Sequence, residues 1–263
     1  MVRVVIIATW NVNSIRAREA RFLAFLERWK PDAVCLQELK VEDAQFPVMQ
    51  LKGVGYHAAF HGQRTYNGVA IVAKEEHALE DVQIGLGDDV EDDHARLIGA
   101  TVGGVHLLSA YFPNGGNMGS DKYAYKLAWM KRLRATLDRR FTAKDPVALL
   151  GDYNVAPFPD DVADPDELEG TVLANPEVRA ALLHIADFGL EDVCRPFHPE
   201  GGVYTWWDYR ARGFERNLGL RIDHVYATGS VAARVIGAAV DREERHGKGA
   251  SDHAPLLVEL REH

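Results

Sequence analysis

The stretch Val147-Ala148-Leu149-Leu150-Gly151-Asp152-Tyr153-Asn154 is a short apolar run that ends in a carboxylate and an amide. A few consecutive apolar residues bounded by turn residues are typical of a buried strand. Such a strand carries its chemistry at its ends, where a charged group reaches water or a ligand without full desolvation. Gly151 permits a turn that a side chain would obstruct. We therefore predict a buried strand that delivers Asp152 and Asn154 to a strand-end loop.

Other apolar runs also end at, or begin from, an acid, an amide or an imidazole. Val4–Ala8 leads to Asn11, Ala33–Leu36 leads to Gln37 and Glu38, Leu220–Tyr226 contains Asp223, and Ser251-Asp252-His253 opens Ala254–Val258. If these ends converge in one cleft, they form a cluster of acid, amide and imidazole groups. That composition is typical of a site that hydrolyses phosphate esters with the help of a hard metal ion.

The overall charge does not decide the partner. A formal net charge of −9 argues against a nucleic-acid partner when taken alone. However, acidic metal ligands count as negative in a sum that omits the bound cation. Acids crowd residues 75–91 and 160–169, whereas the stretch Tyr204–Arg221 carries more arginines than acids. The distribution of charge therefore leans slightly towards a polyanion.

The chain shows no feature of a membrane or secreted protein. No apolar run approaches the roughly 18 residues that a membrane span needs, and the apolar N-terminal run lacks the layout of a secretory signal. Cys35 and Cys194 lie in apolar contexts, and two cysteines cannot form a disulfide framework. We expect no membrane association and a reducing, cytoplasmic setting.

Helical signals are few and strand signals are many. Glu19–Lys30 has apolar residues at helical spacing and stops at Pro31, Ser120–Arg140 begins with a capping serine, and a third helix begins at Asn175-Pro176 and closes at Gly189. The expected strands are Val2–Ala8, Ala33–Leu36, Gly68–Ala73, Arg96–Val102, Val105–Ala110, Val147–Leu150, Gly219–Tyr226 and Ala254–Leu260. Gly103-Gly104 reads as a hairpin turn, and the expected loops are 113–119, 157–169 and 209–218. No linker divides the chain, so we expect residues 1–263 to form one mixed α/β domain with paired sheets inside and helices outside.

Three motifs carry candidate chemistry, and each also has a structural explanation. Glu38 follows an apolar strand and is a candidate Mg²⁺ ligand, or else a surface glutamate at the start of a loop. Asp152 and Asn154 can hold a water or a second cation against a phosphorus atom, although both are ordinary turn residues. His253, oriented by Asp223, can stabilise charge on a phosphoryl oxygen. The alternative is a capped surface histidine and a strand-end salt bridge.

An aromatic cluster stands apart from these acids. Trp206-Trp207-Asp208-Tyr209 is followed by the arginines Arg210, Arg212, Arg216 and Arg221. Aromatic rings beside arginines suit a pocket for a sugar ring and its flanking phosphates. The alternative is a packing cluster at the edge of the core.

Taken in chain order, the motifs resemble the exonuclease/endonuclease/phosphatase superfamily, and within it the exonuclease III branch of apurinic/apyrimidinic (AP) endonucleases. The match runs nearly end to end through Thr9–Arg16, Pro31–Glu38, His61-Gly62-Gln63, Asn67–Ala70, Tyr111–Gly115, Gly151–Asn154, Trp206–Arg210, Gly219–Asp223 and Ser251–Pro255. A single Gly-Asp-x-Asn is a weak signal, whereas this many motifs in this order is a specific one.

The resemblance implies an α/β fold, a four-layer sandwich with two packed mixed β-sheets flanked by helices. It implies a DNA-repair phosphodiesterase that depends on Mg²⁺, with Mn²⁺ as a substitute, and that cuts 5′ to abasic sites and leaves a 3′-hydroxyl. Exonuclease activity in the 3′→5′ direction and 3′-phosphodiesterase activity are further activities of that branch. The implied partner is double-stranded DNA with abasic sites or damaged 3′ ends, bound by a monomer in base excision repair.

The resemblance also implies roles for single residues. Glu38 would be the principal metal ligand, with Asn11 and Asp252 close to the metal, and Asp152, Asn154 and His253 would form a second metal site. Asp152 would activate the attacking water with Asn154, His253 with Asp223 would bind the scissile phosphate, and Tyr111 would bind that phosphate or assist the leaving group. Trp206 and Trp207, with Phe158, would wall a pocket for the extrahelical abasic sugar. The implied phosphate contacts on the flanking strands are Arg96, Lys122, Lys126, Arg210 and Arg216.

Two positions depart from the family pattern. Tyr153 stands between Asp152 and Asn154 where smaller or unbranched side chains are familiar, and residues 160–175 are acidic and short. The short segment puts the strength of the exonuclease activity in doubt. Two alternatives remain, a phosphatase of the same superfamily that acts on a small phosphoester and a catalytically silent DNA-binding or partner-binding module. The Trp206–Arg210 segment weighs against the first, and the intact acid, amide and imidazole set weighs against the second.

Overall fold

The computed structural model describes residues 4–262, apart from the side chain of Ala211. Its centre is a pair of mixed six-stranded sheets. The first sheet has the order β13-β14-β1-β2-β4-β3 and is built from β1 (Val4–Asn11), β2 (Ala33–Gln37), β3 (Tyr56–His61), β4 (Val69–Lys74), β13 (Val235–Val240) and β14 (Leu256–Arg261). The second has the order β5-β6-β7-β8-β12-β9 and is built from β5 (Glu80–Ile84), β6 (Leu97–Val102), β7 (Val105–Tyr111), β8 (Val147–Asp152), β9 (Leu190–Asp192) and β12 (Asp223–Thr228).

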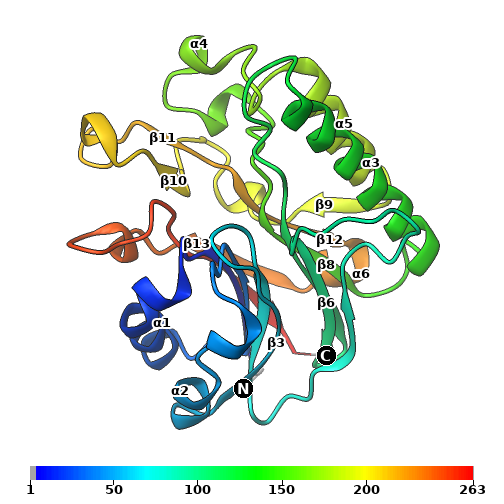
Figure 1. The fold of residues 1–263 in the computed structure, drawn as a ribbon, viewed down its shortest axis with the longest axis vertical. Coiled ribbons are helices and arrows are strands. Elements are labelled where there is room, and N and C mark those ends of the chain that lie inside the picture. The colour runs from blue at the N-terminus through cyan, green and yellow to red at the C-terminus, as the bar shows by residue number, and fades with distance from the viewer. Residues whose placement is uncertain (1–3, 263) are drawn as a thin grey trace.

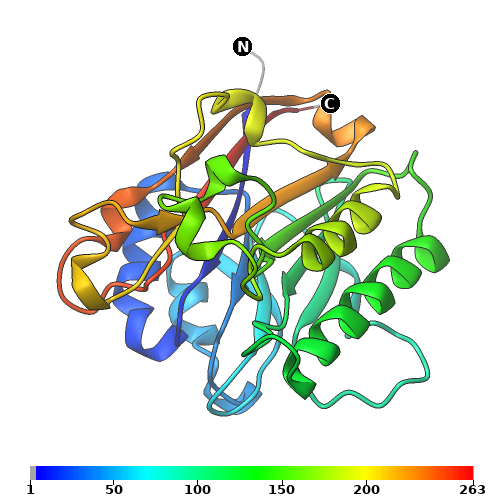
Figure 2. The ribbon, with the colours of Figure 1, turned by 90° about the horizontal axis from the view of Figure 1, so that it is seen from above.

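Helices cover the outer face of each sheet. The helices are α1 (Ile15–Trp29), α2 (Val48–Gly53), α3 (Asp121–Arg140), α4 (Pro165–Leu168), α5 (Pro176–Ala186) and α6 (Gly229–Ala232). Figures 1 and 2 show α1 on one side of the paired sheets and α3 and α5 on the other. Short 3₁₀ turns occur at Asp43–Gln45, Pro159–Asp161, Arg195–Phe197, Arg210–Arg212 and Arg242–Arg245. The predicted four-layer α/β sandwich is confirmed.

Three apolar layers hold this arrangement together. Between the sheets, Cys35 and Ile71 of the first sheet share a cluster with Leu107 and Leu150 of the second. One outer layer joins the first sheet to α1 through residues such as Phe25, and the other joins the second sheet to α3 and α5. Burying apolar side chains on both faces explains why the strands read as continuous apolar runs. None of the helices in residues 4–262 is long and apolar enough to cross a membrane.

Strand register brings the ends of the predicted runs to one end of the sandwich. β1 and β2 are parallel, with Asn11 opposite Gln37. β7 and β8 are parallel, with Tyr111 opposite Asp152, and β12 is antiparallel to β8, with Asp223 also opposite Asp152. The two sheets are joined at this end by a hydrogen bond of 3.1 Å from Gln37 Nε2 to Ser109 Oγ. The carboxyl ends of the parallel strands therefore open onto a common edge.

Most predicted elements are present with small shifts in their bounds. Ser120 and Asn175 cap α3 and α5 as expected, and Gly103 and Gly104, both at positive φ, connect β6 to β7. The helix predicted from Glu19 begins at Ile15, because Ser14 accepts a hydrogen bond from Ala17 N as the N-cap. The predicted strand Val2–Ala8 starts two residues outside the described part of the chain.

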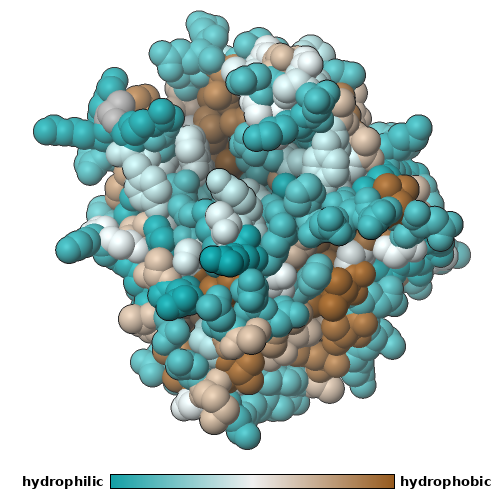
Figure 3. All heavy atoms as spheres, in the orientation of Figure 1, coloured by the Kyte–Doolittle hydropathy of each residue, from teal (hydrophilic) through white to brown (hydrophobic). Residues whose placement is uncertain are grey.

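Other predictions of secondary structure were wrong. The expected strand Gly219–Tyr226 is broken into β11 (Gly219–Leu220) and β12, and β11 pairs with β10 (Trp206–Trp207) in a separate two-stranded sheet. The strands β3, β5, β9 and β13 were not predicted. β5 is an edge strand exposed along its whole length. Figure 3 shows apolar residues, in brown, at the surface on the side of the molecule where β6 lies.

Candidate active site

The turn after β8 places Asp152 and Asn154 as the sequence predicted. A Cβ on Gly151 would lie 1.8 Å from Ala110 O on the neighbouring strand, so only glycine fits there. Asp152 Oδ1 accepts a hydrogen bond of 2.9 Å from Asn154 N. Asn154 lies in the left-handed region at φ 49°. The turn thus fixes both side chains relative to the end of the strand.

Asn11 joins the two sheets at the site. Its Nδ2 donates to Glu38 Oε1 at 2.7 Å and to Asp152 Oδ2 at 2.9 Å. The two carboxylates come from different sheets, and Asn11 is fully buried between them. Lys40 Nζ lies 2.8 Å from the other oxygen of Glu38 and donates to Asn13 Oδ1. Although burial alone would raise the pKa of Glu38, Lys40 and Asn11 hold it below its usual value.

His253 faces two aspartates. Its Nδ1 lies 2.8 Å from Asp223 Oδ2 and its Nε2 lies 3.7 Å from Asp152 Oδ2. Burial alone would lower the pKa of His253, but Asp223 and Asp152 raise it to about 10, so the ring is an imidazolium at neutral pH. In contrast, burial and then the charges of Asp223 and Glu38 raise the pKa of Asp152, against the opposing effect of His253. The predicted orientation of His253 by Asp223 is present in the structure.

Three of these residues form a group that fits a metal ion. Glu38, Asp152 and His253 each offer a ligand atom, and these atoms lie within 4.8 Å of one another. Among the described residues, no group donates a hydrogen bond to the buried oxygen Asp223 Oδ1. Buried carboxylates that outnumber their cationic partners create a negative field that a divalent cation relieves. The carboxylate oxygens of Glu38 and Asp152 therefore fit a divalent metal, and His253 would complete the donor set only in its neutral form.

Asp252 and Trp206 border the same site. Trp206 Nε1 donates to Asp252 Oδ2 at 3.0 Å, and Asn13 Nδ2 donates to Asp252 Oδ1 at 2.9 Å. Trp206 is half-buried, pairs with His253 in an isolated bridge and packs against a small apolar cluster that includes Leu220. Both oxygens of Asp252 thus have donors from the protein, as do both oxygens of Glu38.

Tyr111 lies where the site opens into a cavity of about 360 Å³. Burial, and then the charges of Glu38 and Asp152, raise the pKa of Tyr111 well above its usual value, so its hydroxyl keeps its proton. The Arg96 guanidinium lies 5.0 Å from the centre of the Tyr111 ring. The cavity is lined by polar, basic and aromatic residues, among them Gln63, Tyr66, Asn67, His94, Arg96, Asn114, Lys122 and Tyr125.

Two predicted DNA contacts are buried, which corrects the sequence-based assignment. Trp207 has no exposed surface because it packs edge-on against Phe214, with Arg242 over its ring. Lys126 also has no exposed surface, and its ammonium donates to backbone carbonyl oxygens. Neither side chain is therefore available to a ligand in this structure. Trp207 is on the buried face of β10, and Lys126 is on the buried side of α3. The spacing of residues in the sequence did not settle which face or side each one takes.

The other predicted contacts lie at the surface. Lys122 and Arg96 line the cavity beside Tyr111, and Arg210 and Arg216 are exposed in the segment that follows Trp207. Arg210 is paired with Asp208 at 2.6 Å. Phe158 is 44% exposed beneath the Arg195 guanidinium. By contrast, the nearby Arg221 is buried in ion pairs of 2.6 Å with Asp161 and Asp192.

Sequence reasoning missed several residues of the site. Asn13 and Lys40 connect Glu38 to Asp252, and both have left-handed backbones, as does Glu38 itself. Non-glycine residues in that region cost about 1–3 kcal/mol and cluster at functional sites. Asn13 and Lys40 each lie two residues after a predicted ligand, which is the signal that could have identified them. Tyr66, which is 69% exposed, gave no signal in the sequence.

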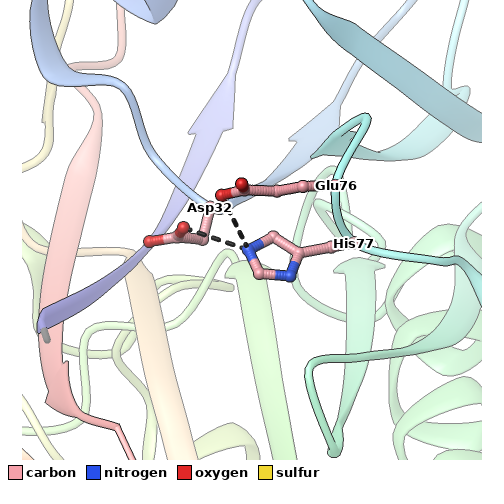
Figure 4. Close-up of side chains that lie close together, drawn as sticks. All are labelled: Asp32, Glu76 and His77. Carbon is pink, nitrogen blue, oxygen red and sulfur yellow. Dashed lines mark hydrogen bonds and ion pairs between the residues drawn. The ribbon is translucent and has the colours of Figure 1, made fainter.

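A second group of two carboxylates and a histidine lies at the other end of β2. Asp32 immediately precedes β2, and His77 Nε2 lies 3.1 Å from Asp32 Oδ1 and 3.8 Å from Glu76 Oε1 (Figure 4). Lys74 Nζ lies 2.8 Å from Asp32 Oδ1, and Ile6 N donates to Asp32 Oδ2 at 2.8 Å. Although burial alone would raise the pKa of Asp32, Lys74, Ile6 and His77 hold it below its usual value. Lys74 pairs with Asp32, and Glu76 is exposed, so no carboxyl of this group is buried against another as Asp152 is; we interpret the group as an ion-pair network.

Comparison with known proteins places this geometry in one family. The family model described as "Endonuclease/Exonuclease/phosphatase family" matches residues 8–253. The chain is 32% identical to exodeoxyribonuclease III of Haemophilus influenzae, over 96% of this chain and 98% of that protein.

Two solved structures are similar over almost the whole chain. An AP endonuclease from Archaeoglobus fulgidus has a TM-score of 0.93 at 40% identity, covering 97% of this chain and 98% of that one. A 3′ phosphatase from Neisseria, bound to a product DNA hairpin, has a TM-score of 0.93 at 38% identity, covering 97% and 99%. The chain therefore belongs to the endonuclease/exonuclease/phosphatase family.

Proposed function

We propose that this protein is a DNA-repair phosphodiesterase of the exonuclease III type, which cuts the DNA backbone 5′ to abasic sites with a divalent metal ion. The observation that carries this proposal is the convergence of Glu38, Asp152 and the His253–Asp223 pair at one end of the two sheets. The similarity to an exodeoxyribonuclease III and to an AP endonuclease supports it. The similarity to a 3′ phosphatase supports activity on damaged 3′ ends as well.

Glu38 would be the principal ligand of Mg²⁺, for which Mn²⁺ would substitute, with Asn11 and Asp252 near the metal. Asp152, Asn154 and His253 would form a second site if a second cation binds, and His253 would then have to lose the proton on Nε2. Oxygen ligands suit Mg²⁺, and the Asn11 amide, which bridges Glu38 and Asp152, holds both carboxylates in place. When bound, the cation would neutralise charge on the phosphate and favour attack by water.

The side chains suggest how the proton and the charge are handled. Asp152, whose pKa is raised, is the group best placed to accept the proton of the attacking water. His253 is protonated, so its Nε2–H can donate to a phosphoryl oxygen while Asp223 holds Nδ1. Tyr111 keeps its hydroxyl proton and can donate it to the phosphate or to the leaving 3′-oxygen. Asn154 would help to orient the water.

The surface beside these groups favours DNA over a small phosphoester. Trp206 borders Asp252 on one side of the site, and the cavity with Arg96, Lys122 and Tyr66 lies beside Tyr111 on another. A polynucleotide would use both surfaces, with phosphates on the basic side chains and the abasic sugar near Trp206. Arg210 and Arg216 would add contacts on the Trp206 side, whereas a small phosphoester would need neither surface.

We further propose that residues 1–263 act as one domain and as a monomer. The apolar layer between the sheets takes residues from both halves of the chain, which supports one domain. We propose a reducing, cytoplasmic setting because Cys35 and Cys194 are both free and buried.

One assay separates the proposed function from its alternatives. The protein is incubated with a duplex that contains one abasic site, with a duplex that ends in a 3′-phosphate, and with a soluble phosphoinositide, each with Mg²⁺ or with EDTA. We expect Mg²⁺-dependent nicking 5′ to the abasic site. Hydrolysis of the phosphoinositide alone would contradict the proposal in favour of a phosphatase. Nicking that persists in EDTA would contradict the role of the metal.

A further inference from the structure

Two buried side chains donate hydrogen bonds to consecutive carbonyl oxygens of the turn that carries Asn154. Lys126 Nζ, from α3, lies 2.6 Å from Asn154 O. His224 Nε2, from β12, lies 2.9 Å from Val155 O. Both side chains are fully buried. The turn is therefore fixed from two elements that belong to different layers of the fold.

The fixed turn controls the side chains of the site. Asn154 N donates to Asp152 Oδ1 at 2.9 Å, so a shift of this backbone moves the Asp152 carboxylate. Asn154 Nδ2 donates to Phe112 O at 3.0 Å, and Asn114 Nδ2 donates to Asn154 Oδ1 at 3.2 Å. The left-handed backbone of Asn154, at φ 49°, stays in place only if the surrounding contacts hold it.

Lys126 connects this turn to two other loops. Its ammonium also donates to Val172 O at 2.8 Å and to Asn114 O at 3.3 Å. Burial lowers the pKa of Lys126 to about 7, against the opposing effect of Asp152. A buried ammonium that has only carbonyl partners is costly to desolvate. Its presence is better explained by a demand for geometry at the site than by a gain in stability.

His224 is an unusual residue for its surroundings. Its ring packs against those of Tyr153 and Tyr226, with centroid distances of 5.0 Å and 5.8 Å. Burial, and then the charge of Arg221, lower its pKa to about 4, so the ring is neutral and donates through Nε2. Among the described residues, Nδ1 has no hydrogen-bond partner, which costs about 1–3 kcal/mol. An apolar side chain would avoid that cost but would lose the bond to Val155.

We propose that Lys126 and His224 are positioning residues that hold Asn154, and through its amide Asp152, in the geometry needed for hydrolysis. Tyr153, the departure from the family pattern, fits this arrangement because its ring packs between Phe112 and His224, and its hydroxyl donates to Leu149 O at 2.8 Å. The expected effect on the rate of nicking rests on the proposed function. The expected effect on the backbone of the turn at Asn154 does not.

The test compares variants that lose or keep each donor. His224→Leu removes the donor, whereas His224→Gln keeps an N–H near the position of Nε2. Lys126→Met and Lys126→Arg form the second pair. We expect His224→Leu and Lys126→Met to lower the single-turnover nicking rate about 10- to 100-fold, because a small misplacement of reacting groups costs that much. The dissociation constant for abasic-site DNA should change less than about threefold, and His224→Gln should recover most of the rate.

Hydrogen exchange provides a measurement without substrate. In the free protein, the Asn154 amide is hydrogen-bonded to Asp152, and we expect it to exchange at least about 10-fold faster in His224→Leu and in Lys126→Met. Leu137→Ala, on the same helix as Lys126 but remote from the turn, is the matched control. It should lower the melting temperature while the exchange of Asn154 and the nicking rate stay near wild-type values.

The outcomes separate the inference from the proposed function. A wild-type protein that nicks no abasic-site DNA would refute the proposed function, and the exchange measurement would still test the turn. Unchanged exchange at Asn154 in both His224→Leu and Lys126→Met would overturn the inference. So would a His224→Gln variant no better than His224→Leu, or a rate that falls equally in Leu137→Ala.

Discussion

The two ends of β2 carry groups of similar composition but opposite physical character. At one end, Asp32 meets Glu76 and His77. At the other, Glu38 meets Asp152 and His253. The group at Asp32 has a lysine on the aspartate and a partly exposed histidine, and the pKa of Asp32 is lowered. The group at Glu38 is more deeply buried, and the pKa of Asp152 is raised.

The comparison teaches that two acids and a histidine do not make an active site. The difference lies in what surrounds them. Asp32 is neutralised by Lys74 and fixed by the backbone of Ile6, so its charge stabilises the fold. Asp152 faces further carboxylates from both sheets, so its charge is held at a cost that a cation or a substrate can relieve. A carboxyl whose pKa is raised, as that of Asp152 is, thus distinguishes the group at Glu38 from the group at Asp32.

The largest expected difference between the two groups is in the reaction rate. Glu38→Ala and His253→Ala should each lower the rate of nicking of an abasic-site duplex by about 10³-fold or more, because each removes a group that contacts the metal or the phosphate. Asp32→Ala and His77→Ala should stay within about threefold of the wild-type rate in the same assay. Near-wild-type nicking by either of the first two variants would refute the assigned roles.

Metal binding should distinguish the groups by thermal stability. A cation at about 100 times its dissociation constant stabilises the folded protein by about 2.7 kcal/mol. We expect Mg²⁺ to raise the melting temperature of the wild type relative to EDTA, as followed by differential scanning fluorimetry. Glu38→Gln should lose this shift and Asp32→Asn should keep it. The reverse pattern would place the metal at the wrong end of β2.

The ionised carboxylate of Asp32 should contribute to the free energy of unfolding, and this contribution should depend on pH. A lowered pKa means that ionised Asp32 stabilises the fold above the ordinary aspartate pKa of about 4, and that this contribution is lost as the pH falls. Asp32→Asn should therefore lower the free energy of unfolding by about 1–3 kcal/mol at pH 7. Urea denaturation at pH 7 and at pH 3 checks this expectation. A loss that is equally large at both pH values would contradict the ionic origin.

An aspartate-to-asparagine substitution in the group at Glu38 should change the free energy of unfolding in the opposite direction and by a smaller amount. A raised pKa means that ionised Asp152 costs stability at neutral pH, so Asp152→Asn should raise the free energy of unfolding in EDTA. Removal of functional strain typically yields about 0.5–2 kcal/mol. Urea denaturation at pH 7, with Asp32→Asn as the matched variant, measures the sign. Destabilisation by Asp152→Asn would remove the contrast between the two groups.

Local signals explain what the sequence predicted correctly. Ser120 and Asn175 cap helices through contacts within three residues, so their effect does not depend on the rest of the fold. The apolar runs of β1, β2 and β8 are buried on both faces, which makes them visible as continuous stretches. The missed strands lack that pattern. β5 is wholly exposed, and β13 consists mainly of small and partly exposed residues.

Residues whose role depends on distant neighbours were harder to assign. Trp206 and Trp207 are adjacent and chemically identical, yet one borders the site and the other packs on Phe214. Lys126 looked like a surface cation on a helix, but the loops at Asn114 and Val172 close over its ammonium. His224 received no role from the sequence, and only the position of β12 shows that its Nε2 donates to Val155 O. Each assignment needed the positions of segments far away in the chain.

The sequence by itself determined the layers of the fold and the chemical identity of the site, because apolar runs, caps and strand-end acids are local properties. The tertiary structure alone decided which acids share a histidine and which of them face further carboxylates. Asp32 and Glu38 flank the same five-residue strand, and nothing local distinguishes their charges. The pKa of Asp32 is lowered, whereas that of Asp152, which Glu38 meets across the two sheets, is raised. The two carboxyls differ because electrostatic energy depends on distance and burial in space, and only the packing of the two sheets sets these.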